Sequence, residues 1–268
     1  MKTHNSVERA VPQYYDEDVA ELFGMYHADG TCVDGSNGSC RIGIHNKDLG
    51  VRREVKRLAK KLFDHDCGEW ISSHKDNEVD TYININHINE LRNQLPKGAH
   101  NKTIPEWLDQ SSTSVINAYI RGLTLDSLLY ADHHGGGRYK IHVMKEQDAR
   151  FIQQHLFSLG IESSIWSLKG KKTSGGWCIQ LGAYATKIFI EKIGWIADKH
   201  TSRMSEVLAW KGKPHRAQRD KITIRQVISI SEDVADVYDV CMPATHSFLG
   251  GCVINHNTGR FSSTEPNL

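Results

Sequence analysis

The sequence predicts a mixed α/β protein made of two similar halves, followed by a short β-rich segment. Three observations predict this fold class. An apolar helix pattern that ends in an acidic residue occurs twice, 97 residues apart. Each copy is followed by the signal of a β-hairpin. After residue 210 the composition changes to a basic, polar stretch that contains Gly212 and Pro214.

The first element of each half is a helix with one apolar face. Apolar residues recur at helical spacing before each acid. In the first copy they are Val19, Leu22, Phe23 and Tyr26, and in the second Ile116, Tyr119, Ile120 and Leu123. The acids that end the two patterns are Asp29 and Asp126.

The next elements are hairpins. Residues 41–45 align with residues 138–142 at the same separation of 97, and glycine-rich turns precede both segments at 34–38 and 133–137. Alternating apolar residues return at 82–86 and 177–181, where a further strand is expected in each half. The two αββαββ-like halves cover about residues 14–110 and 111–210.

Bulk composition indicates a globular protein rather than a disordered one. Of the 268 residues, 39% are hydrophobic and 24% are charged. No apolar run approaches the roughly 20 residues that cross a bilayer, and residues 1–18 lack the apolar core of a secretion signal. We therefore expect no membrane partner and a cytoplasmic location, in a bacterial or phage-infected cell. The six cysteines form no CxxC pair and are expected to be reduced thiols.

The position of the two acids points to metal chemistry. A helix dipole disfavours negative charge at the C-terminal end, where both acids lie. Two such carboxylates brought together by pseudo-symmetry would repel one another unless a cation lay between them. Carboxylate oxygens suit Mg²⁺, and such a site can activate water against a phosphodiester. Asp29 and Asp126 are therefore the predicted metal ligands and catalytic carboxylates.

The first helix resembles a known signature. Leu22 to Gly30 is similar to the nine-residue motif of LAGLIDADG homing endonucleases, and the stretches 102–106 and 118–123 also resemble this family. The resemblance covers most of residues 14–200. It implies that Gly24 and Ala28 let two helices approach closely. It also implies a double-stranded DNA target, and we expect Arg41, Arg138 and Lys140 on the hairpin strands to contact it.

The second copy departs from the motif. Gly122 lies four residues before Asp126, whereas Gly24 lies five before Asp29, and Arg121 occupies the position at which the offset of 97 places a glycine. The offset favours Asp126 as the second ligand, and Asp132 remains the alternative. The departure also leaves open a decayed domain that binds DNA or RNA without cutting it, as in maturase-like proteins.

The C-terminal segment has a different resemblance. Residues 237–240, 246–248 and 251–257 are similar, in order, to the last two conserved blocks of inteins. The resemblance implies that 211–257 is a linker and splicing segment that completes a Hint fold. It assigns cyclisation to Asn257, assistance to His256, proton transfer to His246 and help in branching to Asp239. Thr258 is then the nucleophile that follows the splice junction.

The flanks complete this interpretation. Residues 258–268 resemble family A DNA polymerases and are expected to be the C-extein. Residues 1–13 form a leader without the N-terminal splicing block of inteins, so we expect a split intein whose N-terminal fragment is a separate partner, although a truncated sequence is an alternative. The target expected for the nuclease is the uninterrupted polymerase gene. A free-standing LAGLIDADG endonuclease is the competing interpretation.

Overall fold

The structure is a computed structural model, and it describes residues 15–34, 39–71, 79–86, 94–131, 137–168, 175–209, 247–250 and 253–256. The chain divides into two compact units, residues 1–213 and 214–268. The first unit contains the two predicted halves.

The first half is an α-helix followed by a four-stranded antiparallel sheet. Helix α1 (Glu17–Asp29) leads into strands β1 (Gly30–Asp34) and β2 (Ser39–His45). Helix α2 (Leu49–Phe63) then precedes β3 (Gly68–Ile71) and β4 (Val79–Asn86). The strand order in the sheet is β1-β2-β4-β3. The expected order of helix, two strands, helix and two strands is confirmed.

The second half repeats this order. A 3₁₀ turn η1 (Ala99–Asn101) and the short helix α4 (Glu106–Asp109) lead to α5 (Thr113–Leu123), the 3₁₀ turn η2 (Thr124–Asp126), β5 (Leu128–Ala131) and β6 (Gly137–Val143). Helix α6 (Glu146–Ser158) precedes β7 (Ser163–Ser167) and β8 (Trp177–Leu181), and α7 (Ala183–Lys192) and α8 (Asp198–Ala209) follow. The second sheet has the order β5-β6-β8-β7, which matches the first.

Polar caps fix where the helices of the first half begin. Asp16 accepts a hydrogen bond of 3.0 Å from the Val19 amide, which would otherwise lack a partner at the start of α1. Asp48 caps α2 through the amides of Gly50 and Val51, and it also accepts from the amides of Asp198 and Lys199 at the start of α8. One carboxylate therefore joins an element of the first half to one of the second.

The hairpin register confirms the separation of 97 in the strands. Thr31 pairs with Gly43 in the first hairpin, and Leu128 pairs with Lys140 in the second. The burial pattern repeats as well. Cys32 and Leu129 are buried, whereas the neighbouring residues Val33 and Tyr130 are exposed. Because strand side chains alternate between faces, the same face of each sheet turns toward the helices.

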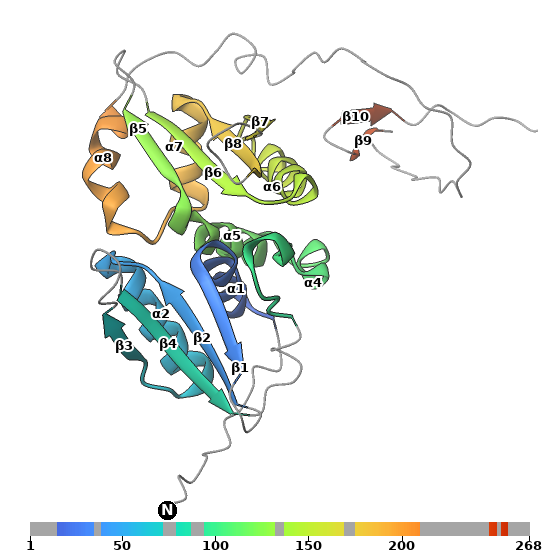
Figure 1. Cartoon of the computed structure of the whole chain (residues 1–268). Helices are drawn as coiled ribbons and strands as arrows, with labels where there is room; N and C mark the ends of the chain where they lie inside the picture. Colours follow the sequence, from blue (N-terminus) through green and yellow to red (C-terminus); the bar gives the residue numbers. More distant parts are fainter. Residues whose placement is uncertain are drawn as a thin grey trace, which may run out of the picture. The chain divides into compact units, whose positions relative to one another are not determined.

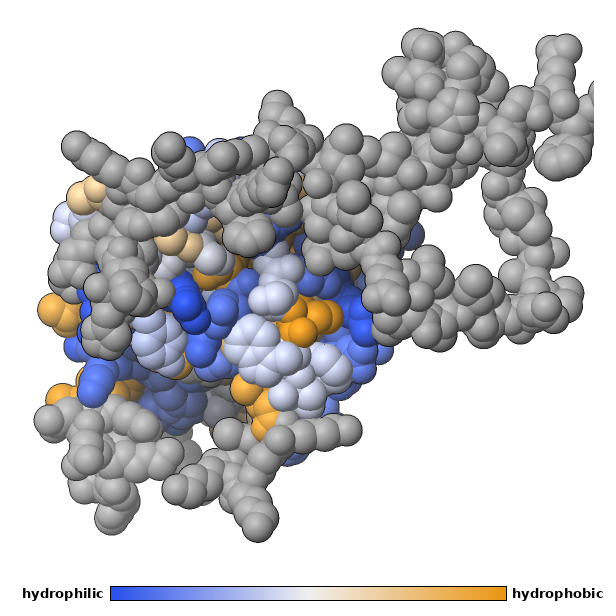
Figure 2. Space-filling view, turned by 90° about the horizontal axis from the view of Figure 1, so that it is seen from above, coloured by the Kyte–Doolittle hydropathy of each residue, from blue (hydrophilic) through white to orange (hydrophobic). Residues whose placement is uncertain are grey.

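The core lies between the sheets and around the paired helices α1 and α5, which occupy the centre of this unit (Figure 1). Buried side chains of both halves form one continuous cluster. Figure 2 shows that the face seen from above is mostly hydrophilic where residues are coloured, with hydrophobic side chains in small separate patches. None of the helices that the structure describes is long and apolar enough to cross a membrane.

In the second unit the described residues form a hairpin of β9 (Ser247–Gly250) and β10 (Val253–His256). Its register pairs His256 with Ser247 and Asn255 with Phe248. The rest of the predicted β-rich segment, residues 211–246, lies outside the described residues.

Candidate active site at the paired helices

Two glycines hold α1 and α5 in direct backbone contact. A Cβ atom on Gly24 would lie 2.0 Å from the Tyr119 carbonyl oxygen, and one on Gly122 would lie 2.2 Å from the Glu21 carbonyl oxygen. These distances are far below van der Waals contact, so each position excludes every side chain. The contacts are reciprocal, as pseudo-twofold symmetry requires.

This reciprocity corrects the alignment of the two helices. Glycine 24 corresponds to glycine 122 and Glu21 to Tyr119, which is a separation of 98 rather than 97. Arg121 is therefore not a misplaced glycine. Its side chain instead links α5 to α1, because its Nε atom donates to the Glu21 carboxylate at 2.6 Å. Arg121 therefore no longer supports decay of the second motif, and a domain that binds DNA or RNA without cutting it stays an alternative.

The 3₁₀ turn η2 absorbs the difference of one residue between helix and strand. From Gly24 to Asp29 the chain makes five α-helical steps, an advance of about 7.5 Å. From Gly122 to Asp126 it makes one α-helical and three 3₁₀ steps, and because each 3₁₀ step rises about 2.0 Å the advance is again about 7.5 Å. The Ser127 amide closes the turn on the Thr124 carbonyl at 3.0 Å. The backbone of Asp126 thus reaches the level of Asp29.

Asp29 ends α1 at the point where the chain enters β1. It is half-buried, and its Oδ2 atom accepts a hydrogen bond of 3.0 Å from the Asn46 side chain. Turn η2, which carries Asp126, packs against α1. The side chain of Asp126 lies outside the described part of the structure. Asp132 lies outside it too, but β5 already runs from Leu128 to Ala131, so Asp132 follows the strand rather than the helix.

A buried lysine offsets the partial negative charge of the backbone carbonyls at the C-terminal end of α1. The Lys102 Nζ atom donates to the carbonyl oxygens of Tyr26 and Gly30 at 2.8 Å and of His27 at 3.3 Å. The Tyr26 and His27 carbonyls belong to the last turn of α1 and carry the negative end of the helix dipole. The ammonium group therefore lowers the electrostatic cost of placing Asp29 at this end.

His27 is buried beside the helix pair. Its Nδ1 atom contacts the Tyr119 hydroxyl, which joins α1 to α5. Burial, assisted by the nearby Lys102 ammonium, lowers the pKa of His27 to about 4. The imidazole is thus neutral at physiological pH and acts as a hydrogen-bonding link in the core.

A polar groove of about 370 Å³ lies along α1, α2 and α5, and Glu21, Glu54 and Arg121 line it together with residues before α8. Burial raises the pKa of Glu21 to about 7, and the neighbouring Glu54 adds to this rise while Arg121 opposes it. Burial also tends to raise the pKa of Glu54, but hydrogen bonds from Arg57 and Glu21, with the charges of Arg57 and Arg121, together lower it. Glu21 therefore holds a proton below about pH 7.

The three residues expected to contact DNA all lie on β2 and β6, which are interior strands of their sheets. Arg41 on β2 is exposed, stacks over the Tyr82 ring at 4.7 Å and donates to the Asn84 side chain at 3.1 Å. Arg138 on β6 is exposed as well. Lys140, also on β6, lies 4.9 Å from the Tyr130 ring centre and 5.6 Å from that of Trp166. They alternate with buried residues, so they belong to the sheet face that turns away from the helices.

Comparison with known proteins finds similarity to DNA polymerases. No family model matches the chain. The chain is 24% identical over 264 residues to a DNA polymerase of Thermococcus litoralis, which covers 92% of this chain and 15% of the polymerase. It is also 24% identical over 173 residues to a DNA polymerase of Thermococcus hydrothermalis, covering 62% of this chain and 10% of that protein. The chain thus spans between 10% and 15% of the length of these curated relatives.

Comparison with solved structures finds a similar fold. Full-length DUF199/WhiA from Thermatoga maritima superposes with a TM-score of 0.51 at 12% identity, covering 79% of this chain and 66% of that one. The N-terminal domain of DUF199/WhiA is described as a LAGLIDADG domain. The endonuclease I-DmoI in complex with DNA and Ca gives a TM-score of 0.49 at 15% identity, covering 71% of this chain and 98% of that one. At 12% identity the likeness to full-length DUF199/WhiA shows the fold alone.

The predicted splicing residues are in the second unit. His256 ends β10, and only its backbone is described. Asp239, His246, Asn257 and Thr258 lie outside the described residues, as do 258–268 and the leader 1–13. Their roles stay predictions.

Two parts of the site were missed by sequence reasoning. Lys102 lies 72 to 76 residues from the carbonyls that it binds, and a periodic pattern carries no signal of that contact. Asn46, which holds Asp29, follows β2 directly. Its position was the available signal, because Asn46 is a polar residue between a hairpin strand and the helix that follows.

Proposed function

We propose that this chain is the C-terminal part of an intein that carries a LAGLIDADG-type homing endonuclease, with double-stranded DNA of a polymerase gene as its target. The reciprocal packing of Gly24 and Gly122 carries the nuclease part of the proposal. It sets two parallel helices side by side, so that Asp29 and Asp126 end their helical segments at one level. The similarity to Thermococcus DNA polymerases supports the link to a polymerase gene.

The residues at the helix ends fit a divalent ion. Asp29 offers hard carboxylate oxygens, and Asn46 restrains its orientation. Asp29 and Asp126 would hold the ion, and when bound Mg²⁺ supplies a water of lowered pKa and charge to offset the leaving oxygen. Arg41, Arg138 and Lys140 would bind the DNA from the exposed strand faces, by contacts to phosphates or base edges.

The nuclease proposal is tested on the full chain with a duplex that carries the uninterrupted polymerase sequence around the codons for residues 258–268. Cleavage is expected with Mg²⁺ and is lost with EDTA. Asp29→Asn and Asp126→Asn should each abolish cutting while binding persists. Asp109→Asn, a change at an exposed acid of α4, is the matched control and should cut as the parent does. Undiminished cleavage by Asp29→Asn would refute the assignment.

The identity of the second metal ligand is tested by comparing Asp126→Asn with Asp132→Asn. If Asp126 is the ligand, Asp132→Asn leaves cleavage unchanged. If cleavage is lost with Asp132→Asn and kept with Asp126→Asn, the assignment passes to Asp132. A chain that binds the duplex specifically but never cuts it would establish the DNA-binding alternative.

The splicing proposal rests on the intein-like residues 237–258, with Asn257 cyclising, His256 and His246 assisting, Asp239 aiding the branching step, and Thr258 as nucleophile. The full chain is mixed with a matching N-terminal intein fragment that carries a reporter peptide. Mass spectrometry should find the reporter joined to Thr258 and a released chain that ends at Asn257. Asn257→Ala should stop ligation. Failure of the parent chain to ligate would refute splicing in trans and would leave the nuclease proposal untouched.

A further inference from the structure

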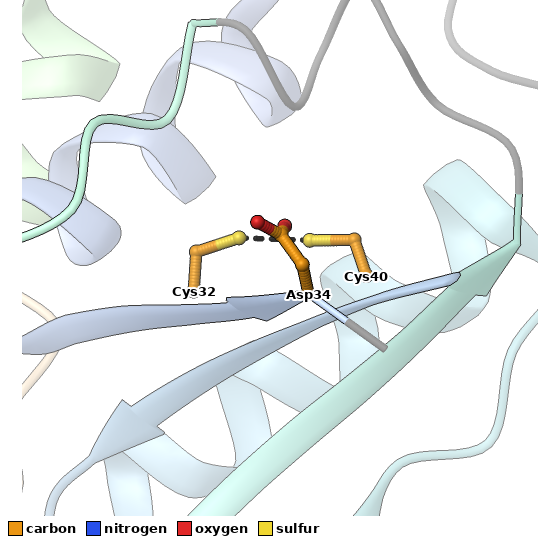
Figure 3. Close-up of side chains that lie close together, drawn as sticks. All are labelled: Cys32, Asp34 and Cys40. Carbon is orange, nitrogen blue, oxygen red and sulfur yellow. Dashed lines mark hydrogen bonds between the residues drawn. The ribbon is translucent and has the colours of Figure 1, made fainter. Parts of the chain in front are cut away.

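Three potential metal ligands gather at the end of the first hairpin. Cys32 on β1, Asp34 at the end of β1 and Cys40 on β2 have ligand atoms within 4.8 Å of one another. Figure 3 shows both thiols and the carboxylate on the same side of the hairpin, with the sulfur atoms turned toward each other. The two Sγ atoms are 2.8 Å apart.

The strand register explains why the three side chains share a face. Asp34 follows Cys32 by two residues, so both side chains lie on the same side of β1. Asp34 is also directly opposite Cys40 in the ladder. The common side is the inner face of the sheet, since Cys32 is 6% and Cys40 5% exposed.

The same register disfavours a disulfide. Cys32 is paired with Ile42 and Cys40 with Asp34, so the two cysteines are diagonal rather than opposite. Diagonal neighbours in an antiparallel pair have Cα atoms about 7–8 Å apart, beyond the roughly 4.4–6.8 Å that a disulfide spans. A metal ion bound between the sulfurs bridges such a spacing once the two thiols rotate apart, without a shift of the strands.

The donor set selects the class of ion. Two thiolates favour a thiophilic cation such as Zn²⁺ over the hard Mg²⁺. Zinc binds thiolate at about 2.3 Å, which sets two tetrahedral sulfurs about 3.8 Å apart, so each thiol would rotate outward slightly. Asp34 supplies the third donor. Its Oδ2 atom pairs with Lys97 Nζ at 2.8 Å, and its other oxygen can face the ion.

The second half provides an internal comparison. At the corresponding positions, 97 residues on, it has Leu129, Ala131 and Gly137, none of which carries a ligand atom. There Val207 of α8 fills the space, since a Cβ atom on Gly137 would lie 2.4 Å from its Cγ2 atom. The end of one hairpin is thus closed by an apolar side chain, whereas the other presents two thiols and a carboxylate.

We propose that Cys32, Asp34 and Cys40 bind a thiophilic divalent cation of the Zn²⁺ class, which fastens the turn end of the β1–β2 hairpin. The site is distinct from the carboxylates at the helix ends, because Asp29 precedes β1 whereas Asp34 ends it. It does not depend on the proposed nuclease or splicing activity.

Cobalt(II) is the probe, because thiolate ligation gives it a charge-transfer band that carboxylate ligation does not. The full chain, reduced and freed of metal, is titrated with Co²⁺, and the band should saturate at one equivalent and disappear when Zn²⁺ is added. Excess Mg²⁺ should not displace it. Absence of a thiolate band overturns the proposal.

Variants locate the site. Cys32→Ser and Cys40→Ser should each abolish the band, whereas Cys67→Ser and Cys178→Ser, at the other cysteines of the described residues, should retain it. Circular dichroism checks that each variant folds. Asp34→Ala changes a half-exposed side chain that tolerates substitution, and it should weaken Co²⁺ affinity by at least about tenfold. A band that survives both cysteine variants, or a Cys32–Cys40 disulfide in chain purified without oxidant, refutes the site.

Discussion

At the scale of single residues, Gly122 and Gly24 decide how closely the halves approach. Both sit where a methyl group would enter a neighbouring backbone rather than a side chain that could move aside. Backbone atoms of two packed helices cannot yield without separating the helices. The hydrogen bonds and burial on either side of the contact therefore depend on these two positions.

We expect Gly122→Ala to destabilise the protein by about 2–4 kcal/mol, because the added Cβ would overlap the Glu21 carbonyl oxygen. Urea unfolding at equilibrium measures this. Gly182→Ala is the matched control, since nothing lies within 4 Å of a Cβ there, and it should cost less than about 1 kcal/mol. Equal effects of the two substitutions would contradict the helix contact.

Glu21 should make stability depend on pH. Its pKa is raised from 4.5 to about 7, chiefly by burial, so the folded state holds a proton that the unfolded state releases. Its contribution is fully present below pH 4.5 and is lost as the pH rises through about 7. The free energy of unfolding should therefore fall, relative to Glu21→Gln, by about 1–3 kcal/mol between these limits. Parallel curves for parent and variant would contradict the buried proton.

At the scale of elements, the C-terminal end of α1 depends on a lysine from a distant segment. We expect Lys102→Met to destabilise the protein by about 2–5 kcal/mol, because the three carbonyls at the end of α1 lose a charged donor. Thermal and urea unfolding measure the loss. Lys60→Met, at an exposed lysine of α2, should change stability by less than about 0.5 kcal/mol.

The elements that the sequence predicts well are those with local periodicity. The hairpins, the helix that ends at Asp29 and the strand at 177–181 all follow from spacing along the chain. The alignment of α1 with α5 does not follow from spacing, because the separation of 97 residues holds for the strands whereas the helices correspond at 98. A 3₁₀ turn has no periodic signature over three residues, so η2 was not visible.

The site was predictable to the same extent. Asp29 ends α1 as the helix pattern predicts, and its role as a metal ligand stays a prediction. The contacts of Lys102 and the meeting of Cys32 with Cys40 depend on long-range folding. The sequence carried one signal for the Cys32–Cys40 contact, which is the hairpin turn between them. A tight turn between two strands can bring residues eight apart onto the same face of the hairpin.

At the scale of the whole molecule, residues 1–213 form a unit whose halves share one core. Helices α1 and α5 belong to different halves, yet they pack against each other, and buried side chains of both halves form one cluster. A chain that ends at residue 213 should therefore unfold in a single cooperative transition, with the midpoint that this unit has in the full chain.

Tryptophan fluorescence and far-ultraviolet circular dichroism monitor that transition. Trp107 reports on the first half, since its ring packs against Phe23, and Trp195 on the second, since it packs against Tyr139. One variant that keeps Trp107 and another that keeps Trp195 should give unfolding curves that coincide. Separate transitions for the two probes would show that the halves are independent domains.

The 3₁₀ turn after α5 also affects which insertions and deletions a duplicated chain can accept during evolution. Removing one codon between a helix and a strand normally rotates everything downstream by about 100° and exchanges the two faces of the strand. Here a tighter turn recovers the lost rise, and β5 keeps Leu129 inside and Tyr130 outside. The turn between α5 and β5 thus compensates for a difference of one codon between the copies. Two halves of unequal length can therefore keep corresponding positions for their helices and strands.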